Sequence, residues 1–357
     1  MKPQGSKSAK SAKVGNKAAP SGAVVRIATR GSALAMAQAN TVLALCASAF
    51  PRRRFELVVI KTTGDRRQAA SMNRPAPDLP KGLFTKELEV ALLRGRADLA
   101  VHSLKDLPTE LPEGLCLGAT LPRADVRDVL VTRRTGRRLA AAKGLMDLPR
   151  GATVATSSTR RVAQLKAARP DLRFVEIRGN VPTRLRKLAE SREIDATILA
   201  WAGLSRLGVR RGAGGILTAP EGLDGEGWSG KVGAVLLSAR TMLPAPGQAA
   251  IGLECRRGDA RVRAVCRAVD HAETRWCVEA ERAFLAGFGG GCHSPIAAWA
   301  RVTAGGTLSL EAVVFEGEMA WRGSGEGPAA RSAAAGRVMG RVAREALGLS
   351  ARTGSPR

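Results

Sequence analysis

Tyrosine is absent from this chain of 357 residues, and aromatic side chains together make up only 3% of it. Proteins that bind single-stranded nucleic acid usually stack bases on aromatic rings, so this scarcity disfavours such a role. No apolar run reaches the roughly 18 residues that a membrane-spanning helix needs. The start of the chain also lacks the hydrophobic segment of a standard secretion signal. We therefore expect neither a membrane partner nor export.

Metal-binding and nucleotide-binding motifs are also lacking. The chain has only three histidines, none at a ligand-like spacing from another, so no metal site is expected. Neither a Walker-A pattern nor a strand–GxGxxG–helix fingerprint is present, which disfavours nucleotides. The cysteines are scattered and form no CxxC pair, which is typical of reduced thiols in the cytoplasm. They are Cys46, Cys116, Cys255, Cys266, Cys277 and Cys292.

Positive charge is abundant. The formal net charge is +26 and the pI is about 11.3. Such a surplus favours an anionic partner, and three explanations stay open at this point. The partner could be a nucleic acid, or a small ligand that carries several carboxylates, or the charge could simply keep the surface soluble.

The order of segments predicts an α/β architecture. Residues 1–23 are basic and almost free of bulky apolar residues, which indicates a disordered tail. After them, short apolar strands such as "VVRIAT" and "ADLAVHS" alternate with helical stretches such as "FTKELEVALLRG". Repeated strand–turn–helix units favour mainly parallel sheets. Two stretches, 67–81 and about 209–235, are interpreted as irregular linkers or insertions. Beyond about residue 271 the pattern changes to that of a small α+β unit with two strands.

Arginines recur where a strand ends and a helix begins. In open α/β sheets ligands collect beyond the carboxyl ends of the strands, and free N–H groups at helix starts attract anions there. Serine and threonine at such points can also be ordinary N-caps. Four junctions that carry arginine together suggest a cleft for carboxylates or phosphates. The residues concerned are Arg30 and Ser32, then Thr156, Ser158, Arg160 and Arg161, then Arg178 and Arg184, and finally Arg206.

Two further stretches suggest chemistry. In "VHSLKDLP", Ser103, Lys105 and Asp106 follow a strand, and an aspartate beside a basic cleft could handle protons or stabilise a cation. The alternative is a turn-forming aspartate next to a surface lysine. In "GFGGGCHSPIAAWA", Cys292 lies among glycines that leave room for something large to reach the thiol. The alternative is a tight turn that happens to contain a small apolar residue.

Taken together, these stretches resemble the porphobilinogen deaminase family, also called hydroxymethylbilane synthase. Matching segments occur in the family's order over about residues 24–300, and they include "RIATRGSALAMAQA", "VHSLKDLPTELPEGL", "ATSSTRR", "IRGNVPTRL", "LPAPGQAAIGLECR" and "GGGCHSPIAAWA". The resemblance implies a transferase that joins four porphobilinogen molecules head to tail with release of ammonia. In this reaction the growing tetrapyrrole would be built on a dipyrromethane primer. Hydrolysis would then release the linear product for porphyrin and haem biosynthesis.

The resemblance also implies roles for individual residues. Cys292 would hold the dipyrromethane cofactor through a thioether, and Asp106 would be the catalytic carboxylate beside the pyrrole nitrogens. The carboxylates of cofactor and substrate would be bound by Arg30, Ser32, Lys81, Ser103, Lys105, Thr156, Ser158, Arg160, Arg161, Arg178, Arg184 and Arg206. Other cleft residues would be Gln38, Phe84 and Gln248.

The family's architecture implies two periplasmic-binding-protein-like domains and a small α+β C-terminal domain. Domain 1 would comprise residues 24–121 and 244–270, domain 2 residues 122–243, and domain 3, which carries the cofactor cysteine, residues 271–350. The resemblance further implies a cytoplasmic monomer that needs neither nucleic acid nor membrane. The chain departs from the family in having "PGQAA" where "PGQG" is common, so Ala249 adds a methyl group near Gln248.

Three other functions can be compared with this one. A solute-binding protein would share the two-domain α/β pattern but would lack the third domain with Cys292. A nucleic-acid-binding protein is supported by charge alone. A thiol hydrolase would use Cys292 with His293, but adjacent residues rarely direct both side chains to one point.

Overall fold

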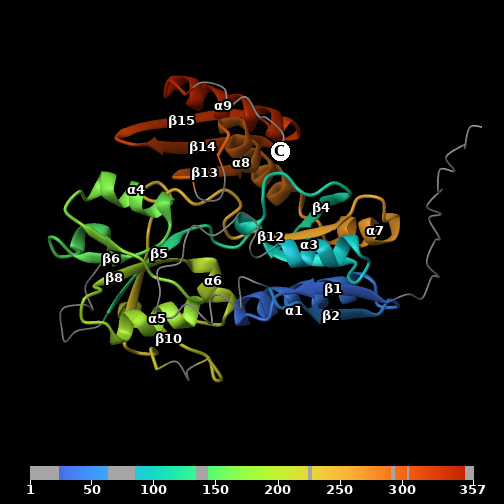
Figure 1. Ribbon diagram of the computed structural model, residues 1–357, viewed down its shortest axis with the longest axis horizontal. Coiled ribbons are helices and arrows are strands. Elements are labelled where there is room, and N and C mark those ends of the chain that lie inside the picture. Colours follow the sequence, from blue (N-terminus) through green and yellow to red (C-terminus); the bar gives the residue numbers. More distant parts are fainter. Residues whose placement is uncertain are drawn as a thin grey trace, which may run out of the picture.

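The computed structural model describes residues 24–62, 85–133, 144–223, 227–290, 294–303 and 305–349. Two five-stranded sheets and one three-stranded sheet dominate this part of the chain. Figure 1 shows the first sheet and its helices at the right in blue and cyan, the second at the left in green, and the C-terminal sheet above both in orange to red. A cleft lies between the first two units.

The first sheet has the strand order β2-β1-β3-β12-β4. Strands β1, β2 and β3 are parallel, and β4 points the same way because both β3 and β4 are antiparallel to β12. Only β12, which comes from much later in the sequence, runs in the opposite direction. The elements are β1 (Val25–Thr29), α1 (Ala33–Ala49), β2 (Phe55–Val59), α3 (Lys86–Leu93), β3 (Leu99–Ser103), β4 (Leu115–Thr120), β12 (Ile251–Arg256) and α7 (Ala260–Val269).

The second sheet repeats this plan with the order β11-β5-β8-β6-β7. Strands β6, β7 and β8 are parallel, while β5 runs against its two neighbours. The elements are β5 (Asp128–Arg133), β6 (Thr153–Ala155), α4 (Thr159–Ala168), β7 (Arg173–Val175), α5 (Val181–Glu190), β8 (Ala196–Ala200), α6 (Trp201–Arg206) and β11 (Val232–Leu236).

The C-terminal unit is an antiparallel sheet covered on one face by two helices. Strands β13 (Ile296–Val302), β14 (Thr307–Glu316) and β15 (Met319–Pro328) form the sheet, and α8 (Ala272–Phe288) and α9 (Ser332–Ala346) form the helical layer. The core between the layers contains Phe284 from α8, Ala343 from α9 and alternate apolar residues of the strands. Phe284 stacks on Trp321 with 6.0 Å between ring centroids.

Local sequence explains where the helices begin and end. Ser32 caps α1 by accepting from the amide of Ala35, and Ser158 caps α4 in the same way. Asn180 caps α5, which carries Pro182 in its first turn, where a missing N–H is harmless. Helix α8 ends at Gly289, whose φ of 83° is the left-handed conformation that glycine adopts without strain.

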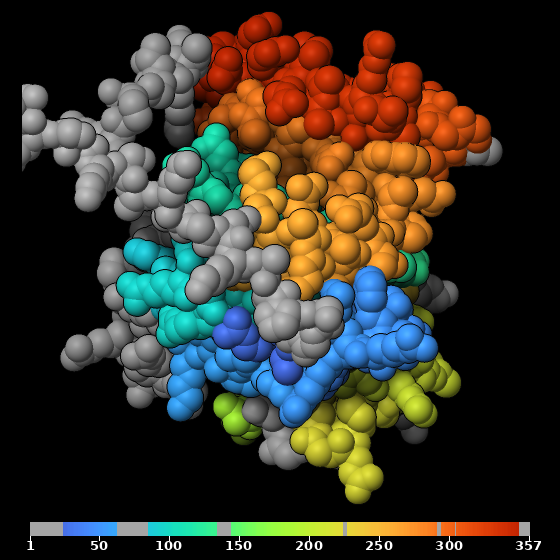
Figure 2. Space-filling model, turned by 90° about the vertical axis from the view of Figure 1, so that its right-hand side faces the viewer, coloured from blue at the N-terminus to red at the C-terminus, as the bar shows by residue number. Residues whose placement is uncertain are grey.

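The return of the chain to the first unit closes its core. Cys255 and Leu253 on β12 and Val262 on α7 pack with Val42 on α1 and with residues of β1 and β3. Figure 2 shows the yellow-orange surface around residues 255–270 lying directly against the blue surface of α1. Strands distant in sequence are therefore fixed side by side, and the two crossings between the units run through residues 121–127 and 237–250.

The predicted α/β class with mainly parallel sheets and an α+β C-terminal unit is confirmed. The sheets fall within the ranges predicted for the three domains, and the boundaries between the domains stay predictions. Strand β15 was not predicted because its sequence, "MAWRGSGEGP", is rich in glycine.

The irregular reading of 209–235 is wrong in part, because the segment holds β9 (Arg210–Arg211), β10 (Leu217–Thr218) and the buried Trp228. The stretch 67–81 lies outside the described residues, as does the N-terminal tail. No described helix is long and apolar enough to cross a membrane.

Candidate active site

A cleft of about 270 Å³ lies where the first two units face each other. The first unit contributes the end of β1, the start of α1 and the turn after β3. The second contributes the starts of α4 and α5, the end of β8 and helix α6, and the crossing segment contributes Ala249 and Ala250. Most of these positions are strand ends or helix starts, where backbone N–H groups point into the open space.

The charge of the cleft is strongly one-sided. Among the described residues, its lining contains five basic side chains and a single carboxylate. The carboxylate belongs to Asp106, which is exposed and sits on the short 3-10 turn Leu104–Asp106 directly after β3. The basic side chains are those of Arg30, Lys105, Arg161, Arg184 and Arg206. Such a lining suits a ligand with several carboxylates.

Asp128 anchors the arginines at the start of α4. Its buried carboxylate accepts from Arg160 at 2.7 Å and from Arg161 at 2.9 Å, and Gln248 Nε2 lies 3.1 Å from it. Burial alone would raise the pKa of Asp128, but the two guanidinium groups more than offset this and lower it to about 2. Two arginines sharing one carboxylate leave a net positive charge beside the cleft.

Both terminal nitrogens of Arg161 are paired within the protein. One of its terminal nitrogens donates to Ile198 O at 2.7 Å and the other to Asp128. Its Nε is buried and has no hydrogen-bond partner among the described residues. A buried donor without a partner is unfavourable, so this nitrogen is a local cost of placing Arg161 at the cleft.

Burial lowers the pKa of three other basic side chains of the cleft. The pKa of Lys105 is lowered to about 8 by burial, with a further lowering from Arg161 that is opposed by Asp106. The pKa values of Arg184 and Arg206 are lowered to about 10, in both cases chiefly by burial. A set of desolvated, mutually repelling cations is stabilised when an anion arrives.

Nine of the predicted site residues line this cleft together. Besides the charged groups, Ser32, Gln38 and Ser103 are present, and Gln38 Nε2 lies 2.9 Å from Ser103 Oγ. The nine are Arg30, Ser32, Gln38, Ser103, Lys105, Asp106, Arg161, Arg184 and Arg206. Lys81, Phe84 and Cys292 lie outside the described residues.

Four predicted residues lie near the cleft without lining it. Thr156 Oγ1 accepts from the amide of Ser158, and Ser158 caps α4, so both hold local backbone. Arg160 is buried and donates to Asp128 and to Leu243 O. Arg178 pairs with Glu176 at 3.1 Å on the exposed side of the junction.

Gln248, the fifth such residue, supports the cleft from behind. It is fully buried, and its Nε2 donates to Val126 O at 2.7 Å. It thereby links the two segments that cross between the units.

Sequence reasoning missed Asp128 and Asn180. The first begins β5 in the segment "RADVRDVLV", where an acid at the start of an apolar strand is the available signal. The second caps α5 with its side chain and lines the cleft. Asn180 also accepts from Thr183 Oγ1 at 2.7 Å, so it shapes the rim of the cleft.

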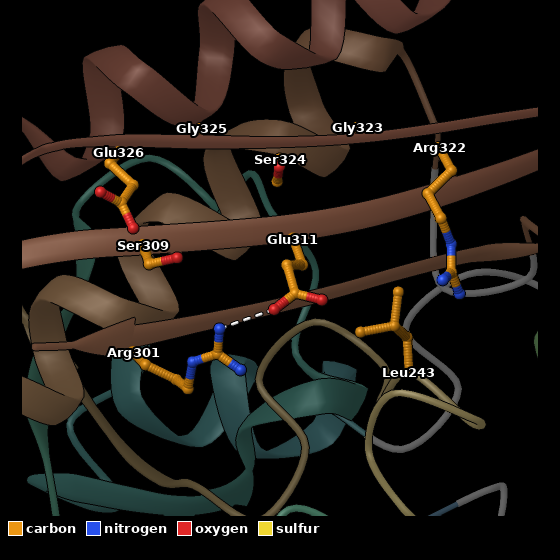
Figure 3. Close-up of a pocket in the computed structure, with 9 residues that line it drawn as sticks. All are labelled: Leu243, Arg301, Ser309, Glu311, Arg322, Gly323, Ser324, Gly325 and Glu326. Carbon is orange, nitrogen blue, oxygen red and sulfur yellow. Dashed lines mark hydrogen bonds and ion pairs between the residues drawn. The ribbon is translucent and has the colours of Figure 1, made fainter.

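A larger hollow of about 620 Å³ lies on the open face of the C-terminal sheet. Figure 3 shows Arg301 and Glu311 pointing toward each other across it, and they form an ion pair at 2.6 Å. Arg322 and Glu326 add one charge of each sign. Because its charges balance, this hollow suits a polyanion much less than the cleft does.

Comparison with known proteins agrees with this geometry. Residues 25–264 match the family model "Porphobilinogen deaminase, dipyromethane cofactor binding domain", and residues 276–343 match "Porphobilinogen deaminase, C-terminal domain". The porphobilinogen deaminase of Desulforudis audaxviator is 44% identical over 87% of this chain and 91% of its own length. That of Paracoccus denitrificans is 43% identical over 87% of this chain and 91% of its own length.

Solved structures show more distant similarity. The periplasmic VFT2 domain of BvgS from Bordetella pertussis is 18% identical, with a TM-score of 0.38 over 69% of this chain and 86% of its own. The BenM effector-binding domain with its effector benzoate is 15% identical, with a TM-score of 0.39 over 69% of this chain and 90% of its own. The sequence matches are far stronger than these, and they show that the chain belongs to the porphobilinogen deaminase family, enzymes of tetrapyrrole biosynthesis that bind a dipyrromethane cofactor.

Proposed function

We propose that the cleft joins porphobilinogen units head to tail onto a dipyrromethane primer attached to Cys292. Each addition releases ammonia, and hydrolysis finally releases the linear tetrapyrrole. The observation that carries this proposal is that five basic side chains and the carboxylate of Asp106 line one cleft in the described part of the chain. Membership of the family supplies the reaction, and the cleft supplies the residues to which its parts can be assigned.

The residues of the cleft fit the cofactor and the substrate chemically. Each pyrrole carries an acetate and a propionate arm, so a two-ring primer already brings four carboxylates. Carboxylates that leave water need charged or hydrogen-bonding partners. The guanidinium groups of Arg161, Arg184 and Arg206 are such partners, and all three residues line the same space.

Asp106 is the residue that we assign to catalysis at the bond-forming carbon. The bound cofactor supplies the free pyrrole carbon on which the product grows. Loss of ammonia from porphobilinogen leaves a positive charge on the substrate, and the Asp106 carboxylate stabilises this charge while accepting hydrogen bonds from pyrrole N–H groups. Asp106 shares its turn with Lys105 and its cleft with Arg161, so the carboxylate lies within the space assigned to the substrate.

The basic lining neutralises the negative charge that accumulates as the tetrapyrrole grows. Every added unit brings two more carboxylates into one space, so repulsion would rise at each step without neutralising charge. Arg30, Lys105 and Arg161 offset that repulsion, and Asp128 offsets the repulsion between Arg160 and Arg161 at the start of α4. Ser32, Ser103 and Gln38 add neutral donors at the wall formed by the first unit.

We further propose that the enzyme acts as a monomer in the cytoplasm. The described cysteines are free thiols, which is typical of a reducing compartment. The carboxylate-binding role stays a prediction for Lys81, Thr156, Ser158, Arg160 and Arg178, as does the place of Phe84 and Gln248 among the other cleft residues.

Intact-mass spectrometry tests the proposal. The wild-type protein should carry the mass of a dipyrromethane and should gain further substrate units when porphobilinogen is added. The Cys292→Ala variant should carry neither. Cys277→Ala, which changes a buried thiol on α8, should behave like the wild type. A dipyrromethane adduct that persists in Cys292→Ala would refute the assignment of the attachment site.

The Asp106→Ala variant tests the catalytic assignment. It should fold with an unchanged circular dichroism spectrum and melting temperature, because the side chain is exposed. Turnover of the cofactor-bearing protein should fall by more than about 100-fold, since the charge at the reacting centre is lost. Retention of more than a tenth of the wild-type rate would reject this role.

A further inference from the structure

Helix α8 of the C-terminal unit contacts the turn that carries Asp106. Arg282 on α8 donates from Nη1 to Leu107 O at 2.9 Å and from Nη2 to Pro108 O at 2.6 Å, with Thr109 O at 3.3 Å. These carbonyls belong to the residues immediately after the catalytic aspartate. One guanidinium thus holds the backbone that leaves the turn.

Apolar contacts reinforce this hold. Val278, one helical turn before Arg282 on α8, packs with Leu104 and Leu107, the two buried residues that flank Lys105 and Asp106. The turn is closed by a hydrogen bond from Leu107 N to Leu104 O at 3.1 Å. The Asp106 side chain itself is exposed, so its position depends on this backbone rather than on packing of its own.

The same helix leads directly into the glycine loop. Helix α8 ends at Phe288, and Gly289 with its positive φ turns the chain away. Cys292 follows the end of the helix by four residues. Helix α8 therefore contacts the turn of Asp106 through Arg282, and its last residue precedes Cys292 in the sequence by four positions.

We propose that Arg282 is a positioning residue, through which α8 fixes the backbone of the turn that carries Asp106. This inference rests on the proposed function, because it assumes that Asp106 and Cys292 serve the same reaction. The guanidinium group acts through backbone carbonyls and does not line the cleft. Its planar fork reaches adjacent carbonyls at once, whereas a lysine ammonium in the same place could hold only part of this set.

Removal of this contact should affect rate more than binding. The arginines that bind carboxylates lie on other elements, so substrate affinity should change little. Misplacement of a catalytic group by about 1 Å can lower the rate by about 100-fold. Because the same turn serves every addition, each elongation step should slow by a similar factor.

The experiment compares Arg282→Gln and Arg282→Lys with the wild type as purified cofactor-bearing proteins. We expect Arg282→Gln to retain the cofactor mass, to keep KM within about threefold and to lose about 10- to 100-fold in kcat. Arg282→Lys should recover part of that loss. Arg275→Gln is the matched control, because Arg275 lies on the same helix and donates to Asp270 and to Gly118 O, away from the turn.

The outcomes separate the inference from the proposed function. A wild-type protein that adds no porphobilinogen units would refute the proposed function itself. If the wild type elongates and Arg282→Gln, calculated per cofactor-bearing molecule, does so within twofold of it, the positioning role is wrong. The same conclusion follows if Arg275→Gln lowers kcat as much as Arg282→Gln does. If Arg282→Gln does not fold, the same criteria apply to Arg282→Lys.

Discussion

At the scale of single residues, the most informative feature is the difference between two neighbours on one turn. Burial lowers the pKa of Lys105 to about 8, while the side chain of the adjacent Asp106 is exposed in the cleft. One side chain therefore has a charge that responds to pH near neutrality, and the other stays available to the reacting atoms. Both follow from the place of the turn, at the end of β3 and opposite the arginines of the second unit.

The lowered pKa of Lys105 predicts a pH-dependent KM. Below about pH 8 the ammonium group is present and attracts substrate carboxylates, and this attraction is lost as the pH rises through 8. Loss of one such ion pair should raise the KM for porphobilinogen about fivefold between pH 7 and 9. Lys105→Met should remove this dependence, whereas Lys166→Met, which changes an exposed lysine on α4, should retain it. An unchanged profile in Lys105→Met would show that another group is responsible.

Ala249 is a second informative residue. It is the one non-glycine residue with positive φ, 69°, in the described part of the chain. Its carbonyl accepts from Arg206 at 2.6 Å and from the amide of Ala124. The left-handed conformation costs about 1–2 kcal/mol for a residue with a Cβ. The chain thus retains local strain where the crossing segment meets the cleft.

Replacing Ala249 by glycine should stabilise the protein. Relief of the strain exceeds the entropy that glycine adds to the unfolded chain, so the free energy of unfolding should rise by about 0.5–1 kcal/mol. Ala250→Gly is the control, because Ala250 is buried, has no positive φ and should lose about 1 kcal/mol. Denaturant titration measures both variants, and destabilisation by Ala249→Gly would contradict the strain argument.

At the scale of elements, strand–helix junctions explain most of the site. The sequence predicts helix starts at Ser32 and Ser158 because these caps are recognisable locally, and both are confirmed. From the sequence, Ser32 could either cap a helix or bind a ligand. In the structure it caps α1 and also lines the cleft. The sequence does not show that Arg160 and Arg161 have different roles. Only the fold shows that Arg160 donates to Leu243 O, whereas Arg161 lines the cleft.

The junction at α4 depends on Asp128. Asp128→Asn should lower the free energy of unfolding by about 3–5 kcal/mol, because it leaves two buried guanidinium groups without their anion. Asp125→Asn, which changes a surface pair with Arg127, should cost less than about 1 kcal/mol. Denaturant titrations at neutral pH compare the two, and equal effects would contradict the central role of Asp128.

The same carboxylate contributes to acid sensitivity with a defined sign. Its pKa is about 2 in the folded protein against an ordinary value of 3.8, so the folded state holds its proton less tightly. The stabilisation of about 2 kcal/mol is fully present above about pH 4 and is lost as the pH falls through 2. In Asp128→Asn this part of the pH dependence should be missing.

At the scale of the whole molecule, the sequence predicted architecture better than contacts. The α/β class, the α+β end and the gathering of arginines all follow from local periodicity and from residues at strand ends. The glycine-rich β15 and the buried Trp228 were missed because their positions are set by neighbouring strands and not by local propensity. The roles of Asp128 and Arg282 depend on contacts between residues far apart in sequence, which a single sequence does not encode visibly.

The central claim is that one cleft between two α/β units binds the carboxylates of a primer attached through Cys292. A crystal structure of the cofactor-bearing enzyme tests it most directly. The account predicts cofactor carboxylates within hydrogen-bond distance of Arg161, Arg184 or Arg206 and pyrrole nitrogens beside Asp106. A cofactor attached to another cysteine, or lying in the charge-balanced hollow of the C-terminal sheet, would contradict it.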